Sequence, residues 1–132
     1  MPEHDKLIVI AGVCGSGKST LVQGLLSHGY QVHSVAQEHS YAPKMWRMKL
    51  PEHLIMLDCS LEKVRLRRKI QWNEDRLVEQ RYRLRNAREN CGLYINTENL
   101  SIQEVLETAL DFLKESEHTG GDTGASQEKP FN

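Results

Sequence analysis

Short apolar segments recur along the chain and predict the strands of a sheet. Residues 7–11 and 54–58 are apolar runs, the second ending in an acid, and such runs are typical of strands buried on both faces of a parallel sheet. Residues 31–36 alternate polar and apolar positions, so they predict a strand near a sheet edge. Residues 91–96 form the last short apolar segment. The pattern therefore predicts a sheet of about four strands.

Helical spacing of apolar residues occupies much of the remaining sequence. A helix is predicted from near Lys18 to residue 26, with Gly29 as its stop. Ser101 and Glu104 form a capping box at the start of the last helix. Further helices are predicted over residues 61–70, 74–90 and 101–113. Strands that alternate with helices predict an α/β domain with a parallel sheet and helices on both faces.

Two segments lack such a pattern. Residues 37–51 contain two prolines and no sustained period, so we expect an irregular connection. From residue 115 onward, glycine, serine, threonine and acidic residues offer little to bury, which predicts disorder. We therefore expect one folded domain over residues 1–114 and a disordered polar tail over residues 115–132.

Composition narrows the class of protein. The chain has 132 residues, which indicates one domain, and a formal net charge of −1, which predicts no bulk attraction to nucleic acid or to a membrane. The sequence has neither an apolar stretch of membrane-spanning length nor a signal peptide. Its three cysteines, Cys14, Cys59 and Cys91, lack metal-ligand spacing, so we expect reduced thiols in a soluble, cytoplasmic protein.

The strongest motif follows the first predicted strand. Residues 12–19, Gly-Val-Cys-Gly-Ser-Gly-Lys-Ser, fit the phosphate-binding loop G-x-x-x-x-G-K-[ST] and lie between a strand and a helix, as such a loop must. Its glycines let the backbone curl so that N–H groups surround a phosphate. Lys18 would reach the β- and γ-phosphates, and the Ser19 hydroxyl would bind Mg²⁺.

We accordingly predict a site for ATP, or another nucleoside triphosphate, together with Mg²⁺. The residues expected to bind the nucleotide are Gly12, Val13, Cys14, Gly15, Ser16, Gly17, Lys18, Ser19 and Thr20.

Three stretches resemble the small P-loop kinases related to adenylate, shikimate and gluconate kinases. They are residues 7–21 with the phosphate loop, residues 54–62 followed by Arg67 and Arg68, and residues 93–101 followed by Glu104 and Val105. The second is similar to that group's penultimate strand and lid helix, and the third to its closing strand and helix. The resemblance implies the three-layer fold of P-loop NTPases and an ATP-dependent phosphotransferase that uses Mg²⁺.

The same resemblance implies roles for several side chains. In shikimate-kinase-like relatives an acid after the second strand serves both the metal and the acceptor hydroxyl, and Glu38 occupies that position. Arg67 and Arg68 match lid arginines that close over the phosphates. With Lys18, these residues are the predicted catalytic set. Asp58, which ends a run like a Walker B strand, is the alternative metal ligand, and its other interpretation is a structural cap of the next helix.

The chain departs from that group between the second and penultimate strands. There the group inserts a helix, a strand with the Walker B acid and another helix, whereas only residues 37–51 are present here; Asn96 also replaces a usual aspartate. Two hypotheses stay open: a phosphotransferase with an unidentified small acceptor, or a nucleotide-binding switch or interaction module. Tyr41 and Trp46 are either the walls of an acceptor loop or, in the case of Trp46, packing in the space of the missing strand.

Basic residues concentrate between Lys63 and Arg88. Arginines that alternate along the predicted helix point around it, so we expect most of them to lie in solvent. Few aromatic residues accompany them for base stacking, so nucleic acid is not an expected partner. The missing strand leaves a sheet edge exposed, and a homodimer is one way to cover it.

Overall fold

The chain folds around one parallel sheet. The structure, a computed structural model, describes residues 6–60 and 74–119. Its strands are β1 (Leu7–Gly12), β2 (Gln31–Ser34), β3 (His53–Asp58) and β4 (Leu93–Asn96). They lie in the order β2-β1-β3-β4, and every pair is parallel. This confirms the predicted α/β fold with a small parallel sheet, and β2 is at an edge as its alternating sequence indicated.

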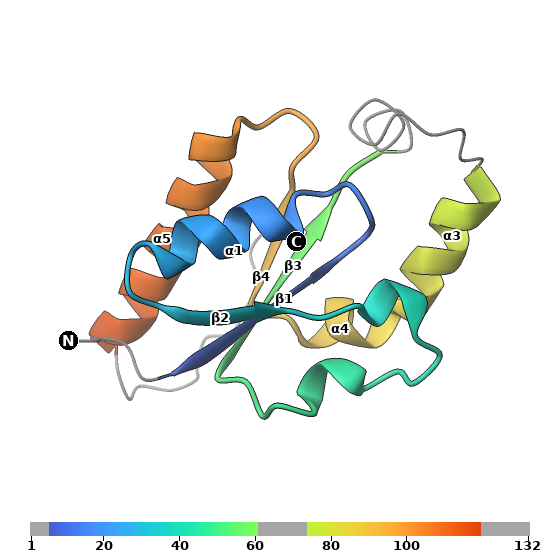
Figure 1. Ribbon diagram of the computed structural model, residues 1–132, viewed down its shortest axis with the longest axis horizontal. Helices are drawn as coiled ribbons and strands as arrows, with labels where there is room; N and C mark the ends of the chain where they lie inside the picture. The colour runs from blue at the N-terminus through green and yellow to red at the C-terminus, as the bar shows by residue number, and fades with distance from the viewer. Residues whose placement is uncertain (1–5, 61–73, 120–132) are drawn as a thin grey trace.

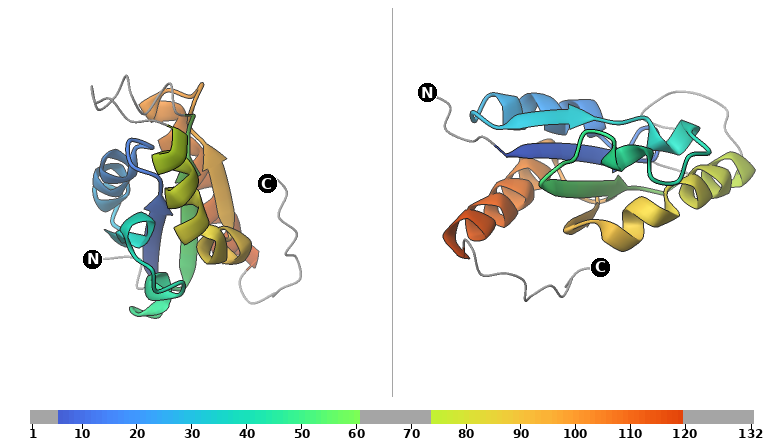
Figure 2. Two further views of the ribbon diagram at one scale, coloured as in Figure 1. Left: turned by 90° about the vertical axis from the view of Figure 1, so that its right-hand side faces the viewer. Right: turned by 90° about the horizontal axis from the view of Figure 1, so that it is seen from below.

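Helices cover both faces of the sheet. The helices are α1 (Lys18–Leu26), α3 (Glu74–Arg83), α4 (Arg85–Asn90) and α5 (Ile102–Thr119), with short 3₁₀ turns at Gln37–His39 and Met45–Arg47. α1 and α5 lie on one side, and α3, α4 and the 3₁₀ turns lie on the other (Figure 1, Figure 2). The three layers are those of a P-loop NTPase. Within the described residues no helix is both long and apolar enough to cross a membrane.

β1 and β3 are almost continuously apolar because their side chains enter two cores, one on each face of the sheet. Ile8 and Ile10 pack with α1 and α5, whereas Val9 and Ala11 pack with the α3 and α4 side. Alternate residues of a strand point to opposite faces, so a sheet covered on both faces needs apolar residues at every position. This architecture places β1 in the interior and brings the loop after it to the carboxyl edge of the sheet.

Glycine is needed at the end of β1 and after the end of α1, for different reasons. A Cβ at Gly12 would lie 2.5 Å from the Leu57 carbonyl oxygen, so the close approach of β1 and β3 excludes any side chain there. Gly29 has a φ of 89°, and the next residue, Tyr30, donates its N–H to the Leu25 carbonyl at 3.2 Å. The predicted stop of α1 is therefore a left-handed glycine that closes the helix.

The helix predicted over residues 74–90 is interrupted. Leu84 has a ψ of 0° and its side chain is fully buried. Because this ψ departs from the helical value, α4 starts in a new direction. Its Ala87 is buried in the second core, the one between the sheet and the helices α3 and α4. The amphipathic pattern alone did not indicate the break.

The last helix is longer than predicted. α5 begins at the capping box, where the Ser101 and Glu104 side chains each accept the other's backbone N–H at 3.0 and 2.8 Å. It continues to Thr119 rather than ending at Leu113, because a helix can extend into solvent without an apolar face. Residues 115–119 of the predicted tail are therefore helical, and residues 120–132 lie outside the described residues.

Candidate nucleotide-binding site

The phosphate loop joins β1 to α1 through left-handed glycines. Gly15 has a φ of 79° and Gly17, at the start of α1, a φ of 104°. Residues with a Cβ rarely adopt this conformation, so the sequence can turn this tightly only with glycine. The first N–H groups of α1 have no partner within the helix and face the loop, which makes the helix start a natural place for a phosphate.

A cavity of about 640 Å³ opens over this loop. Its polar floor is made of loop and α1 residues, and Glu38 and His39 close one side. The opposite wall is apolar and comes from the segment after β4 and from α5: Leu100, Ile102, Val105 and Leu106. A polar floor beside an apolar wall suits a ligand that has both a charged tail and a flat apolar group.

Lys18 points into the site. Its Nζ atom donates to the carbonyl oxygens of Gly12 at 2.8 Å and Val13 at 3.3 Å, and it forms an ion pair with Glu38 Oε2 at 2.8 Å. The lysine side chain is 15% exposed and the glutamate side chain 5%. The ammonium is thus held beside the loop by partners that a phosphate could replace.

Glu38 lies in the 3₁₀ turn after β2 and keeps unused acceptor capacity. Its Oε1 atom is buried and has no hydrogen-bond partner among the described residues. The turn itself is fixed by Gln37, which is fully buried, donates to the Ala42 carbonyl at 2.7 Å and accepts the Trp46 N–H at 2.9 Å. A rigid turn therefore holds a carboxylate beside Lys18 with one oxygen available.

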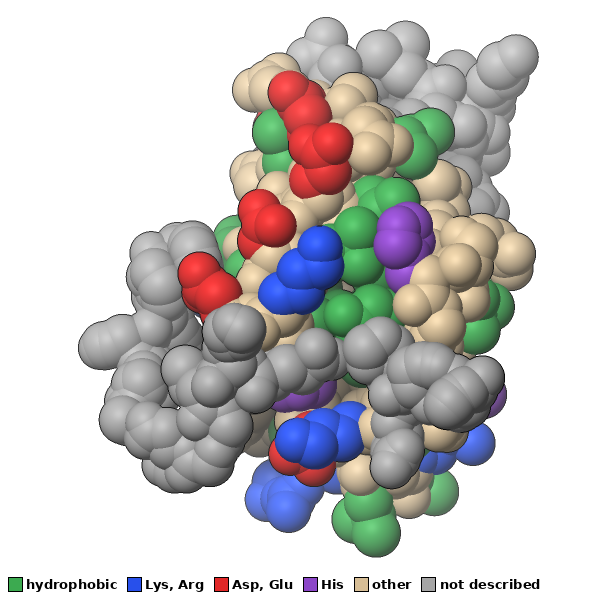
Figure 3. Space-filling view, turned by 90° about the vertical axis from the view of Figure 1, so that its left-hand side faces the viewer, with side chains coloured by type: hydrophobic (Ala, Val, Ile, Leu, Met, Phe, Trp, Pro, Cys, Tyr) green, Lys and Arg blue, Asp and Glu red, His purple; other side chains and the backbone are tan. Residues whose placement is uncertain are grey.

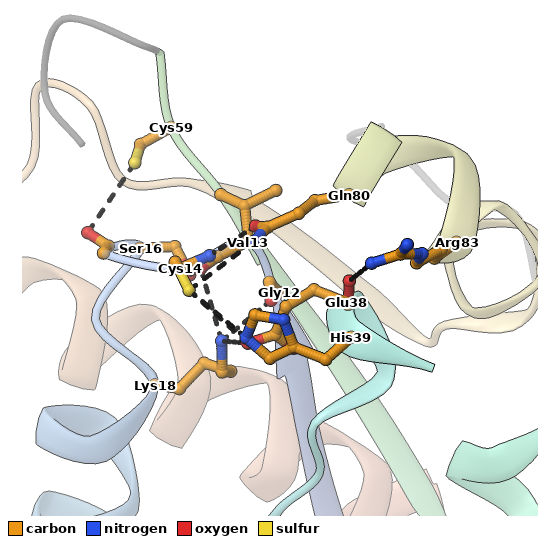
Figure 4. A network of polar contacts seen from close by, with 11 residues as sticks. Gly12, Val13, Cys14, Ser16, Lys18, Glu38, His39, Cys59, Gln80 and Arg83 are labelled. Carbon is orange, nitrogen blue, oxygen red and sulfur yellow. Dashed lines mark hydrogen bonds and ion pairs between the residues drawn. The ribbon is translucent and has the colours of Figure 1, made fainter. Parts of the chain in front are cut away.

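Two further side chains meet Glu38, as Figure 4 shows. The Cys14 sulfur lies 3.9 Å from Glu38 Oε2 and 3.6 Å from His39 Nε2. Gln80 of α3 accepts the Cys14 N–H at 3.0 Å and points its amide nitrogen at the sulfur, 3.6 Å away. Sequence reasoning placed Cys14 in the loop but found no partner for His39 and gave Gln80 no role. The side-by-side position of β1 and β2 brings Cys14 close to Glu38 and His39, and α3 adds Gln80.

Asp58 has a different environment from Glu38. Its Oδ1 accepts the Cys59 N–H at 2.9 Å and the Arg81 guanidinium at 3.1 and 3.2 Å, and its Oδ2 accepts the Tyr94 hydroxyl at 2.8 Å. Burial of the phenol, followed by its bond to Asp58, raises the pKa of Tyr94 to about 12. The predicted role of Asp58 as a metal ligand stays a prediction, and both of its oxygens already have protein partners.

The segment after Glu38 packs against the sheet. Trp46 is 9% exposed, belongs to the second core and donates its ring N–H to Asn86 at 2.9 Å. Tyr41 is 77% exposed, and the Arg83 guanidinium lies 4.3 Å from its ring centre. The hypothesis that both rings form the walls of an acceptor loop is therefore wrong. Trp46 fills space on the sheet because its large apolar surface is more stable buried.

The arginines of α3 and α4 mostly contact protein groups. Arg83 is only 15% exposed, pairs with Glu79 at 2.8 Å and donates to the Glu38 carbonyl at 3.3 Å. Arg85 and Arg88 lie over tyrosine rings, 3.9 and 3.7 Å from the ring centres. Arg76, Arg81 and Arg85 are exposed, so most of the arginines described on these two helices lie at the surface as expected, while Arg83 and Arg88 are partly buried. Arg67 and Arg68 lie outside the described residues.

The side of the molecule that carries α5 is acidic. Figure 3 shows several acidic side chains on this face, with a smaller number of basic ones among them. The exposed charged residues of α5 are Glu104, Glu107, Asp111, Lys114 and Glu115.

The sequence also matches a known family over part of its length. Residues 8–71 match the viral superfamily 1 RNA helicase core domain, a P-loop NTPase-type domain. The match starts in β1, includes the phosphate loop and β3, and covers a little less than half of the chain. It gives no support to the small kinases in particular. A comparison with curated proteins finds no matching sequence. The fold and the loop are those of a P-loop NTPase-type domain, and the match to a helicase core domain agrees with nucleotide binding at this loop.

Proposed function

We propose that this domain is a small phosphotransferase that moves the terminal phosphoryl group of a nucleoside triphosphate to a hydroxyl acceptor. The observation that carries the proposal is the buried Lys18–Glu38 ion pair at 2.8 Å beside the phosphate loop. One partner suits the phosphates, and the other suits an acceptor hydroxyl or a metal ion.

The donor side of the reaction uses the loop. The triphosphate would lie along the start of α1, with its base against the apolar wall made by residues such as Leu100 and Val105. The negative phosphates would draw the Lys18 ammonium away from Glu38, because a triphosphate offers more charge than one carboxylate. This exchange would leave the carboxylate without its cation.

The residues present fit a Mg²⁺ ion beside the phosphates. The Ser19 hydroxyl lines the cavity, and Glu38 has a buried oxygen with no partner among the described residues. Hard oxygen ligands of this kind, completed by water and phosphate, suit Mg²⁺. When bound, the ion would neutralise charge on the phosphates.

The acceptor side depends on Glu38. An acceptor oxygen attacks the γ-phosphorus while the bond from that phosphorus to the β-bridging oxygen breaks. The hydroxyl proton passes to the Glu38 carboxylate, which works as general base once Lys18 has left it. The fixed 3₁₀ turn supports this role because it keeps the carboxylate at the cavity wall.

The donor step is tested by nucleotide titration of the full chain. We expect Lys18→Ala to weaken ATP affinity about 100-fold, since it removes the ammonium that contacts the phosphates. Lys44→Ala, at an exposed lysine of the neighbouring segment, is the matched control and should leave affinity unchanged. Equal affinities for the wild type and Lys18→Ala would contradict the assignment of the loop as the phosphate-binding site.

A second function, a nucleotide-dependent switch without an acceptor, is favoured by one observation. Trp46 and Gln37 fold the segment after β2 onto the sheet, so this segment builds no separate acceptor wall. In that case nucleotide binding would alter the Lys18–Glu38 pair and hydrolysis would be slow.

An acceptor screen separates these functions. Radiolabelled γ-phosphate of ATP or GTP is offered with Mg²⁺ and a panel of nucleoside monophosphates, sugars and hydroxy acids. Label on an acceptor supports the phosphotransferase, and slow phosphate release that no acceptor stimulates supports the switch. A single-stranded RNA arm is included because the family match is to an RNA helicase core. RNA-stimulated hydrolysis without labelled acceptor would contradict the phosphotransferase.

A further inference from the structure

The side chains of Cys14, Glu38 and His39 form a cluster beside the phosphate loop that the proposed function does not use as a unit. Sγ, Oε2 and Nε2 lie within 4.8 Å of one another. The distance from sulfur to the imidazole nitrogen is 3.6 Å, from sulfur to the carboxylate oxygen 3.9 Å, and from nitrogen to oxygen 3.6 Å. We propose that this cluster is a binding site for a zinc-class divalent ion, which shares only Glu38 with the proposed Mg²⁺ site.

The distances match a tetrahedral ion. Bond lengths of about 2.0–2.3 Å and tetrahedral angles put neighbouring zinc ligands roughly 3.3–3.6 Å apart. The three observed separations are within a few tenths of an ångström of this range. The cluster therefore supplies one triangular face of a tetrahedron and leaves the fourth position to water or to another ligand.

The donor set selects the type of ion. A thiolate and an imidazole are soft or intermediate ligands, which bind zinc, cobalt(II) and related ions and are poor ligands for Mg²⁺. Glu38 adds the carboxylate through Oε2, and its Oε1 is buried without a partner among the described residues, so this side chain has unused acceptor capacity. That second observation is independent of the distances.

The protein also orients the sulfur. Gln80, which is 2% exposed, holds the Cys14 backbone through its carbonyl oxygen and points its amide nitrogen at Sγ. Hydrogen bonds of this kind fix the ligands of metal sites and tune their affinity. His39 is 54% exposed on its side chain, so an ion can reach the site from solvent.

Zinc and Lys18 compete for the same oxygen. Lys18 Nζ lies 2.8 Å from Glu38 Oε2, so a bound cation would meet both electrostatic repulsion and loss of that ion pair. Zinc at this site would therefore occupy Glu38 and oppose its use as a base. Zinc bound here would therefore inhibit phosphoryl transfer at the same loop.

The experiment is a cobalt(II) and zinc titration of the full chain, without an affinity tag and without nucleotide. A near-ultraviolet charge-transfer band and intense visible bands from cobalt report thiolate ligation in a tetrahedral site, and zinc should displace them. We expect these bands in the wild type, their loss in Cys14→Ser, and zinc affinity at least about 100-fold weaker in His39→Gln.

Matched controls use side chains of the same types elsewhere. Cys91→Ser, at a buried cysteine that donates to the Arg88 carbonyl, and His33→Gln, at an exposed histidine, should keep the bands. Bands that survive Cys14→Ser, or that vanish in Cys91→Ser, would overturn the assignment. Should Cys14→Ser fail to fold, the exposed His39→Gln variant decides the question alone.

Lys18→Met tests the third ligand. Removal of the ammonium should raise zinc affinity by at least about tenfold, because the buried carboxylate is then without a cation. Unchanged or weaker zinc binding would exclude Glu38 from the site. Because these measurements use no nucleotide, the zinc site and the phosphotransferase can fail separately.

Discussion

Two acids stand at the carboxyl edge of the sheet, after the two strands that flank β1, and the protein treats them in opposite ways. Asp58 ends β3, and both of its oxygens accept hydrogen bonds from Cys59, Arg81 and Tyr94. Glu38 follows β2, shares one oxygen with Lys18 and leaves the other without a partner in the described part of the chain. A carboxylate with all its acceptors in use stabilises a fold, whereas one with capacity to spare is ready for a ligand.

The largest effect should come from Glu38→Gln. An amide cannot take the acceptor proton, so we expect turnover to fall about 1000-fold while the free energy of unfolding changes by less than about 1 kcal/mol. Turnover with a labelled acceptor and urea denaturation measure the two quantities. Glu79→Gln, at a half-exposed acid of α3, is the control and should keep turnover. A Glu38→Gln enzyme as fast as the wild type would erase the difference between the two acids.

The opposite pattern is expected for Asp58→Asn. Loss of the charge that faces Arg81 should lower the free energy of unfolding by about 1–2 kcal/mol, a figure reduced because the Arg81 side chain is 45% exposed. Nucleotide affinity should change by less than about threefold. Urea midpoints and ATP titration check this. A collapse of turnover in a stable Asp58→Asn protein would show that Asp58, rather than Glu38, serves the reaction.

A smaller effect concerns pH. Because the pKa of Tyr94 is about 12 in the folded protein and about 10 in an unfolded chain, the folded state holds this proton more tightly. The stability that its bond to Asp58 provides is fully present below about pH 10 and is lost as the pH rises toward 12. Ultraviolet titration should show a tyrosinate that forms near pH 12 and is absent in Tyr94→Phe. Titration of every tyrosine near pH 10 would mean that the Asp58 network is open to water.

Sequence alone was sufficient where one physical requirement controls several consecutive residues. Burial on both faces requires an apolar run, so β1 and β3 could be predicted from sequence. Phosphate binding requires Gly15, Gly17 and Lys18 in a fixed spacing, so the loop could be predicted as well. Glu38 was singled out by the resemblance to kinases that place an acid after the second strand, and its carboxylate lies 2.8 Å from Lys18.

The remaining features depend on contacts between distant segments. Gln80 is a single polar residue on an amphipathic helix, and nothing in its neighbours marks it as the side chain that holds Cys14. The same is true of Gln37, whose amide replaces main-chain partners inside the turn. Trp46 could be assigned either to a pocket or to the core until the packing of α4 against it was known.

Gly12 has a consequence for how the domain can respond to a ligand. Gly12 pairs with Leu57 in the parallel ladder and no Cβ fits beside the Leu57 carbonyl, so the first residue of the loop is held close against the neighbouring strand. We therefore expect the flexible Lys18 side chain to move when a phosphate binds, while the main chain at the start of the loop stays in place. Nucleotide binding would then affect the rest of the domain through a change of side-chain partners and not through movement of β1.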